Sequence, residues 1–161
     1  MLSEPDAGNG FLAGHVADLL RSYRELTGKH LIEPEDDQAR QAYEAPFVLL
    51  SHDGAGDPLL TYGNLAAQKL FAMEWGCLVG SPSRETAEAP ERTERGDLLR
   101  RVAENGFIED YSGERIAADG RRFTIRHASV WNVSDTHGKR IGQAAAFSKW
   151  DADETHDSGH A

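Results

Sequence analysis

The side chains best suited to holding a ligand gather in the C-terminal part of the chain. Tyr111, His127, Trp131 and Gln143 supply a phenol, an imidazole, an indole and an amide within residues 106–150. A flat apolar surface with a few convergent polar groups is the usual makeup of a small-molecule site. The same stretch carries no nucleophile motif, phosphate loop or metal-ligand cluster. The pattern therefore favours ligand binding over covalent chemistry.

Arginines are a second source of chemistry, because a guanidinium can fork onto a carboxylate or a phosphate. The five that stand out in this acidic chain are Arg84, Arg115, Arg121, Arg122 and Arg126. They could form one anion site. With many acidic neighbours available, however, pairing across the sheet is the favoured interpretation. Arg84 is the exception, because it follows Pro82 and Ser83 in an irregular segment from which we expect it to reach inward.

Other tempting residues have plainer interpretations. Ser51, His52 and Asp53 include the residue types of a catalytic triad, but a triad is defined by geometry, and no Gly-x-Ser-x-Gly elbow is present. Cys77 is expected to be a small buried side chain. The tail that holds His156 and His160, with Asp153, Glu154 and Asp157, is more readily a solvated segment than a metal site. We therefore predict neither a catalytic residue nor a metal ligand.

Three strand-like segments must position the ligand-holding side chains. They cover residues 107–117, 122–133 and 139–150, and turn residues such as Asp119 and Gly120 separate them, which predicts an antiparallel meander. Strict alternation along the second segment gives one face to Phe123, Ile125, His127, Ser129, Trp131 and Val133. If that face meets the helices, Trp131 and His127 line a cavity with Tyr111 and Gln143. The plainer alternative makes Trp131 a core residue and His127 a structural one.

The upstream residues predict two short strands and several helices. The strands lie near residues 47–50 and 59–62, and the later helices at 65–71, 75–80 and 91–105. Apolar residues at helical spacing predict an amphipathic helix from Phe11 to Leu26, and a short helix over 34–43 follows. The order of elements predicts an α+β fold, with an antiparallel sheet and the short helices on one face.

Composition limits the partners and the domain organisation. The 161 residues include 27 acidic and 17 basic side chains, a net charge of −10, which argues against nucleic acid as a partner. One cysteine allows no intrachain disulfide, and neither a signal peptide nor a membrane span is evident, so a cytoplasmic protein is expected. The expected divisions are a flexible N-terminus at 1–10, a helical segment at 11–45, a domain at 46–150 and a disordered acidic tail at 151–161.

Two sets of motifs resemble a known family. Asn64-Leu65-Ala66-Ala67, Leu70-Phe71, Trp75 and Leu78-Val79-Gly80 resemble the helical middle of a PAS domain, a sensory fold whose five strands are split two and three. More narrowly, the chain resembles the MEKHLA domain, a PAS-like module found alone in bacteria and at the C-terminus of certain plant homeodomain transcription factors; the stand-alone bacterial type is the better match. The motifs that carry this resemblance are Pro82-Ser83-Arg84, Gly106-Phe107, Tyr111-Ser112-Gly113 with Arg115, Gly120-Arg121-Arg122-Phe123, Ala128 with Val130-Trp131, and Gly142-Gln143-Ala144-Ala145 before Phe147 and Trp150.

The resemblance implies a PAS-like five-stranded sheet and a sensory or regulatory class. In flavin-binding photosensory relatives an Asn-Cys pair precedes an arginine just after the position of Gly80. Here that stretch reads Gly80-Ser81-Pro82-Ser83-Arg84, so a flavin-cysteine adduct is not expected, whereas non-covalent flavin binding stays open.

The leading hypothesis is a sensor that binds a small molecule or a protein partner and signals through a change of conformation or assembly. The candidate ligand-binding residues are Trp131, Tyr111, His127, Gln143, Arg84, Phe123 and Trp75. One alternative is a small enzyme that uses His127, Tyr111 and Arg84 in a PAS-like pocket. Another is a pure protein-interaction module. The helix from Phe11 to Leu26 could make a homodimer contact or fold back on its own sheet.

Overall fold

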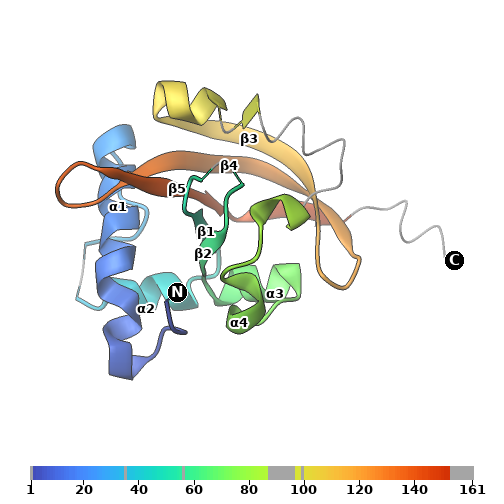
Figure 1. Ribbon diagram of the computed structural model, residues 1–161, viewed down its shortest axis with the longest axis horizontal. Coiled ribbons are helices and arrows are strands. Elements are labelled where there is room, and N and C mark those ends of the chain that lie inside the picture. The colour runs from blue at the N-terminus through green and yellow to red at the C-terminus, as the bar shows by residue number, and fades with distance from the viewer. Residues whose placement is uncertain (1, 35, 56, 87–96, 99, 153–161) are drawn as a thin grey trace, which may run out of the picture.

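An antiparallel sheet forms the centre of the computed structural model, which describes residues 2–34, 36–55, 57–86, 97–98 and 100–152. Neighbouring strands follow the order β2, β1, β5, β4, β3, and β6 also pairs with β4 (Figure 1). The strands are β1 (Val48–His52), β2 (Leu60–Gly63), β3 (Phe107–Ile116), β4 (Arg122–Ser134), β5 (Arg140–Phe147) and β6 (Lys149–Ala152). The predicted α+β fold with an antiparallel sheet is confirmed. The third segment of the meander is divided at Ser148 into β5 and β6.

Short helices lie between β2 and β3, and longer helical segments precede β1. They are η1 (Ala7–Leu12), α1 (Ala13–Thr27), α2 (Gln38–Glu44), α3 (Leu65–Phe71), α4 (Trp75–Leu78) and η2 (Ser83–Thr86). Residues 97–98 and 100–105 are also helical. Residues 87–96, 99 and 153–161 lie outside the described residues. They include the first part of the helix expected over 91–105 and most of the expected tail.

The turns of the meander follow from residue types. Gly120 and Gly138 have φ angles of 89° and 80°, which glycine adopts at little cost. Asp135 Oδ1 accepts hydrogen bonds from the backbone N–H groups of His137 (2.9 Å) and Lys139 (3.0 Å). Such side-chain acceptors stabilise a tight turn. The long strands β3, β4 and β5 are therefore joined by the hairpins that the sequence predicts.

The buried side chain of Asn64 links α2, β1 and α3 through hydrogen bonds. Its Oδ1 accepts from the N–H groups of Ala67 (3.0 Å) at the start of α3 and Leu49 (3.1 Å) in β1. Its Nδ2 donates to the carbonyl oxygens of Ala42 (3.0 Å) and Phe47 (2.8 Å). As the N-cap, Asn64 satisfies a helix donor that would otherwise be unpaired, and it holds α3 against the sheet.

The two faces of the sheet carry different helices. The amphipathic helix α1 buries Val16, Leu19 and Tyr23 in a cluster with Trp131 of β4. The opposite face packs against α3, where the rings of Phe71 and Phe123 lie 5.3 Å apart. In Figure 1, α1 lies at the left of the view, and α3 and α4 lie together below and to the right of the centre. Thus α1 folds back on its own sheet, which was one of the two placements left open for this helix.

A bulge in β4 corrects the expected alternation. His127 has a φ of 52°, a left-handed conformation inside a strand, and the register between β3 and β4 shifts beside it. Phe123 and Ile125 face α3, but beyond the bulge the same face is taken by Ala128 and Val130. An extra residue in a strand exchanges its two faces. Trp131 therefore faces α1, and the prediction that it shares a face with Phe123 is wrong.

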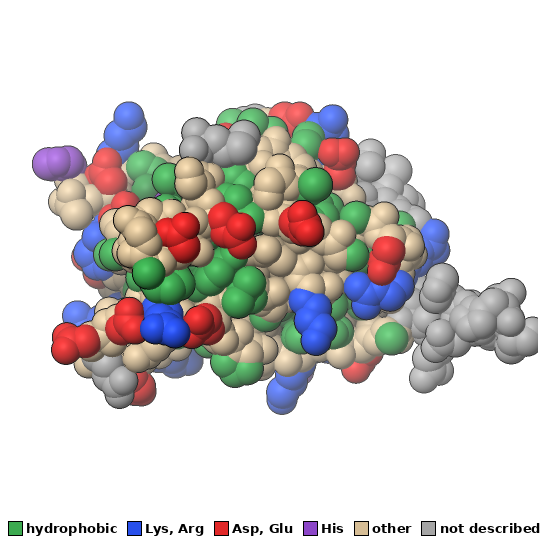
Figure 2. Space-filling view, turned by 90° about the horizontal axis from the view of Figure 1, so that it is seen from below, with side chains coloured by type: hydrophobic (Ala, Val, Ile, Leu, Met, Phe, Trp, Pro, Cys, Tyr) green, Lys and Arg blue, Asp and Glu red, His purple; other side chains and the backbone are tan. Residues whose placement is uncertain are grey.

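The surface is mixed in character. On the face seen in Figure 2, acidic, basic and apolar side chains are interspersed. Within the described residues, no helix is both long enough and apolar enough to cross a bilayer.

Candidate functional site

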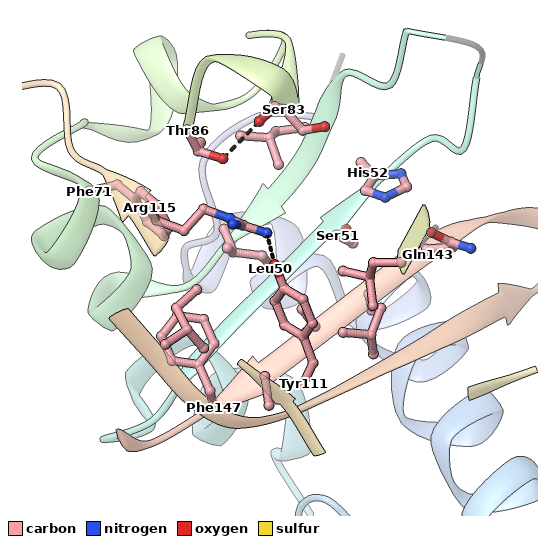
Figure 3. A pocket seen from close by; sticks show the side chains of 17 residues that line it. Leu50, Ser51, His52, Phe71, Ser83, Thr86, Tyr111, Arg115, Gln143 and Phe147 are labelled. Atoms are coloured by element: carbon pink, nitrogen blue, oxygen red, sulfur yellow. Dashed lines mark hydrogen bonds between the residues drawn. The ribbon is translucent and has the colours of Figure 1, made fainter. Parts of the chain in front are cut away.

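A cavity of about 80 Å³ lies between the sheet and the short elements that cover one of its faces. Figure 3 shows side chains from the strands and from η2 pointing toward one another across this space. The lining from β1, β2 and β5 is Leu50, Ser51, His52, Leu60, Gln143, Ala144, Ala145 and Phe147. The lining from β3, β4 and the covering elements is Tyr111, Arg115, Ile125, Ala128, Val130, Phe71, Ser83, Thr86 and Leu98.

Arg115 and Tyr111 form the polar centre of the cavity. Tyr111 lies two residues before Gly113 in β3 and Arg115 two residues after it, so the two side chains project from the same face of the strand. The guanidinium donates to the Tyr111 hydroxyl (2.5 Å) and lies 5.4 Å from the centre of the Tyr111 ring. It also donates to the Glu114 carbonyl oxygen (2.6 Å). Arg115 is only 8% exposed, so these contacts hold a buried cation.

Gly113 is what allows this pair to form. A Cβ at that position would lie 2.7 Å from Tyr111 Cζ and would clash with the hydroxyl oxygen. Such distances are closer than non-bonded carbon atoms normally approach. The missing side chain therefore lets the Tyr111 ring lie across the strand and meet Arg115.

A second polar wall comes from β5 and β1. Gln143 is 1% exposed, and its Nε2 donates to Asn132 Oδ1 (3.0 Å) on the neighbouring strand. His52 Nδ1 accepts from the Gly54 N–H (3.0 Å), which leaves the proton of a neutral ring on Nε2. In Figure 3, His52 and Gln143 lie on the side of the cavity away from Arg115.

The candidate residues predicted from the sequence are distributed over several places. Tyr111 and Gln143 line the cavity. Phe123 is buried next to Phe71 in the α3 cluster, outside the cavity lining. Trp75 packs at the start of α4, where its indole N–H donates to the Leu2 carbonyl oxygen (3.0 Å).

Three other candidates lie away from the cavity. Trp131 is fully buried beneath α1, and its indole N–H donates to the Leu19 carbonyl oxygen (3.1 Å). His127 is exposed at the bulge, beside an open hollow formed with β6. Arg84 does not reach inward as expected, because its exposed guanidinium pairs with Asp57.

From the sequence, Arg115 was one of five arginines that could form an anion site, with pairing to acids across the sheet favoured; for Arg115 that pairing is wrong, because its guanidinium donates to the Tyr111 hydroxyl and the Glu114 carbonyl oxygen. Ser83 and Thr86 were not selected as candidates. A usable signal was present for Arg115, since Tyr111, Gly113 and Arg115 fall at alternate positions of one predicted strand. Ser83 and Thr86 lie in η2, where Thr86 Oγ1 donates to the Ser83 carbonyl oxygen (2.7 Å). No periodic pattern marks such a short turn.

The Ser51 hydroxyl is part of a hydrogen-bond network with Thr61 and His15. Its Oγ lies 2.8 Å from Thr61 Oγ1 and 3.1 Å from His15 Nε2 of α1. Burial lowers the pKa of His15, and nearby Asp18 partly opposes that shift. Ser51 is 3% exposed, so this chain of hydroxyl and imidazole groups fastens α1 to the sheet.

Comparison with solved structures finds the same fold in PAS and Light-Oxygen-Voltage domains. The PAS domain of a protein from Colwellia psychrerythraea superposes with a TM-score of 0.58 at 14% identity, over 68% of this chain and 90% of that one. An RNA-binding Light-Oxygen-Voltage receptor gives 0.58 at 19% identity over 68% of this chain, which spans 31% of the receptor. A Light-Oxygen-Voltage domain studied with a flavin analogue gives 0.57 at 12% identity, over 78% and 92%. These likenesses show a PAS-like fold.

Sequence comparison gives the family. Among curated proteins, none matches the sequence significantly. The model of the MEKHLA domain, in contrast, matches residues 13–152, which include every described strand and all of α1. The chain therefore belongs to the MEKHLA domain family.

Proposed function

We propose that this protein is a sensory or regulatory domain that binds a small molecule in the cavity beside Arg115 and Tyr111. The observation that carries the proposal is a cavity at the centre of a sensory fold, lined by apolar side chains with a few polar groups from separate strands. That makeup is typical of ligand sites. A cytoplasmic location is part of the proposal, and the single cysteine supports it.

The signal would pass through the sheet to α1. Val130 faces the cavity, and the next residue of β4, Trp131, faces the opposite side and hydrogen-bonds to Leu19 of α1. A ligand that shifts β4 would therefore change how α1 packs on the sheet. Because α1 buries its apolar side chains on this sheet, a homodimer contact through the helix from Phe11 to Leu26 would use its outer surface or follow its release.

Flavin, an analogue of which was used to study a Light-Oxygen-Voltage domain of similar fold, does not fit this site. The cavity of about 80 Å³ is far below the about 300–1,000 Å³ of sites for larger organic ligands. Cys77 is exposed on α4, so the expectation that it is buried is wrong, and it is not among the described cavity-lining residues. We therefore derive no step through a flavin.

The enzyme alternative has little geometric support. It requires His127, Tyr111 and Arg84 to converge, but His127 and Arg84 are exposed and outside the cavity that Tyr111 lines.

A cavity-filling variant tests the proposal. Ala128 lines the cavity and is 1% exposed, so Ala128→Leu should occupy the space that a ligand needs, at a cost of about 1–3 kcal/mol in stability. Ala13→Leu makes the same change on the exposed start of α1 and serves as the control. The measurement is the change in Tm with a panel of small carboxylic acids, amides, alcohols and amines.

We expect at least one compound to raise the Tm of the wild type and of Ala13→Leu, but not that of Ala128→Leu. An equal response of Ala128→Leu would place binding elsewhere, and no response of the wild type to any compound would contradict small-molecule sensing.

A further inference from the structure

Arg115 is a buried arginine, and among the described residues it has no acidic partner. The exposed residues Arg84, Arg121 and Arg126 pair with Asp57, Asp119 and Asp151. In the described part of the chain, no carboxylate lies within ion-pair distance of the Arg115 guanidinium, and none of the described residues that line the cavity is Asp or Glu. These three exposed arginines thus have carboxylate partners, whereas the hydrogen bonds of buried Arg115 go to the neutral oxygens of Tyr111 and Glu114.

A buried guanidinium without an anion is an unfavourable arrangement. Removing a cation from water costs free energy that neutral hydrogen bonds recover only in part. The bonds to Tyr111 and Glu114 engage two of the five N–H donors of the guanidinium. The remaining donors, and the positive charge itself, are suited to an oxyanion from solution.

Tyr111 is placed to add a second contact to the same anion. Its hydroxyl oxygen accepts from Arg115, so its own proton can be donated to another oxygen. In Figure 3 the hydroxyl and the guanidinium meet near the middle of the cavity, where one ligand could contact both.

The size and the remaining lining limit what else the ligand carries. About 80 Å³ is roughly half of the 150 Å³ of a cavity known to accept benzene, so only a few non-hydrogen atoms fit. Ile125, Val130 and Phe147 present hydrocarbon next to the polar pair. A carboxylate with a short alkyl tail matches both features, because its tail can contact these side chains while its oxygens meet Arg115. A larger acid does not fit this space, and among the described lining residues Arg115 is the only Lys or Arg, so a second negative charge would lack such a partner there.

We propose that the cavity binds a short-chain carboxylate of the size of acetate or propionate, held by the Arg115 guanidinium and the Tyr111 hydroxyl. This assignment rests on the proposed function and names the class of molecule that its site takes.

Thermal shift of the full chain tests the assignment with sodium acetate and sodium propionate as probes. Sodium chloride at equal ionic strength, sodium nitrate and acetamide, the neutral isostere of acetate, are the comparison solutes. We expect acetate and propionate to raise the Tm of the wild type in a saturable way, and the comparison solutes to have little effect. A response to acetamide or chloride equal to the acetate response would overturn the role of charge. An equal response to nitrate would overturn the carboxylate assignment.

The variants locate the effect. Arg115→Met should abolish the response, and Arg115→Lys and Tyr111→Phe should weaken the apparent affinity about 10-fold or more, as expected for lost hydrogen bonds to a charged group. Arg84→Met, which removes an exposed and paired arginine, should respond like the wild type. Arg115→Met is expected to fold, because an apolar side chain often replaces a buried charge without loss of stability. If it does not fold, Arg115→Lys and Tyr111→Phe carry the test, and an undiminished response in both would overturn the proposal.

The outcomes separate this inference from the proposed function. If a neutral compound stabilises the wild type and Arg115→Met but not Ala128→Leu, the cavity is a small-molecule site and the carboxylate assignment is wrong. If no compound of either panel stabilises the wild type, both are wrong.

Discussion

Single buried polar side chains set much of the specificity of this fold at the scale of residues. Asn64 is completely buried and forms hydrogen bonds with α2, α3, β1 and the residue before β1. Arg115 and Gln143 are likewise buried, yet they lie at the cavity rather than in the core clusters. A buried polar group has to be matched by a partner, so each of these positions tolerates few side chains.

A pH dependence of stability is expected from His15. Burial lowers the pKa of this imidazole, so the unfolded chain takes up a proton at a higher pH than the folded protein does. Above the ordinary histidine pKa of about 6.5, His15 is neutral in both states and the folded protein keeps its full stability. As the pH falls below that value, protonation of the unfolded chain lowers the free energy of unfolding. The groups that face His15 are Asp18 of its own helix, Tyr62 at 5.8 Å between ring centres, and Asp53 across a surface hollow.

His15→Gln removes this titration while keeping a side chain that can reach Ser51. Urea unfolding at about pH 7.5 and about pH 5.5 should show a smaller loss of unfolding free energy for the variant than for the wild type. The exposed His127→Gln should keep the wild-type loss. An equal loss in His15→Gln and the wild type would contradict the role of His15.

Which arginine enters the cavity could not be settled from the sequence. The sequence around Arg84 shows no regular pattern, although the residue lies in η2, and its ion pair with Asp57 joins residues far apart in the chain. Tyr111, Gly113 and Arg115 fall at alternate positions of one predicted strand, but this spacing does not tell which strand face is buried. That distinction depends on where η2 and α3 pack.

At the scale of elements, local residue types predicted the hairpins but not the bulge. Asp119-Gly120 and Asp135 with Gly138 are turn-forming sequences whose effect is confined to a few residues. The bulge at His127 is a left-handed residue in the middle of a 13-residue strand, and its sequence carries no glycine to announce it. Because of this bulge, the strand face predicted for Trp131 was wrong. Tyr111 and Gln143 belong to other strands, and both line the cavity.

Gly142 marks a close approach between β5 and the end of β1. A Cβ there would clash with the carbonyl oxygen of His52 and lie 3.1 Å from its carbonyl carbon. Since these are backbone atoms of a paired strand, they cannot rotate away. Gly142→Ala should lower the free energy of unfolding by about 3 kcal/mol, the cost of severe overpacking.

Gly14 is the matched control. It lies in α1, and a Cβ at this position would meet no atom within 4 Å, so Gly14→Ala should stabilise the protein by about 0.5–1 kcal/mol. Chemical denaturation of both variants measures the two effects. A Gly142→Ala protein as stable as the wild type would show that the strands do not approach this closely.

At the scale of the whole molecule, the two faces of the sheet have separate tasks. One face holds the cavity, and the other holds α1 through Trp131, Ser22 and Arg21, whose guanidinium donates to the Ser134 carbonyl oxygen (2.5 Å). The order of elements and the family motifs predicted this PAS-like architecture well, because strand order follows from the sequence of hairpins and helices. The size of the cavity could not be predicted in this way, since it is the small volume left after many side chains pack.

The most direct test of the account is an NMR titration of the wild-type protein with sodium acetate that follows the Nε–Hε signal of Arg115. Saturable shifts of this signal and of the Tyr111 and Gln143 backbone amides, absent with acetamide, are the predicted result. Shifts that remain linear in acetate, or that spread over exposed arginines such as Arg84 and Arg121 while Arg115 is unchanged, would contradict a ligand site at this cavity.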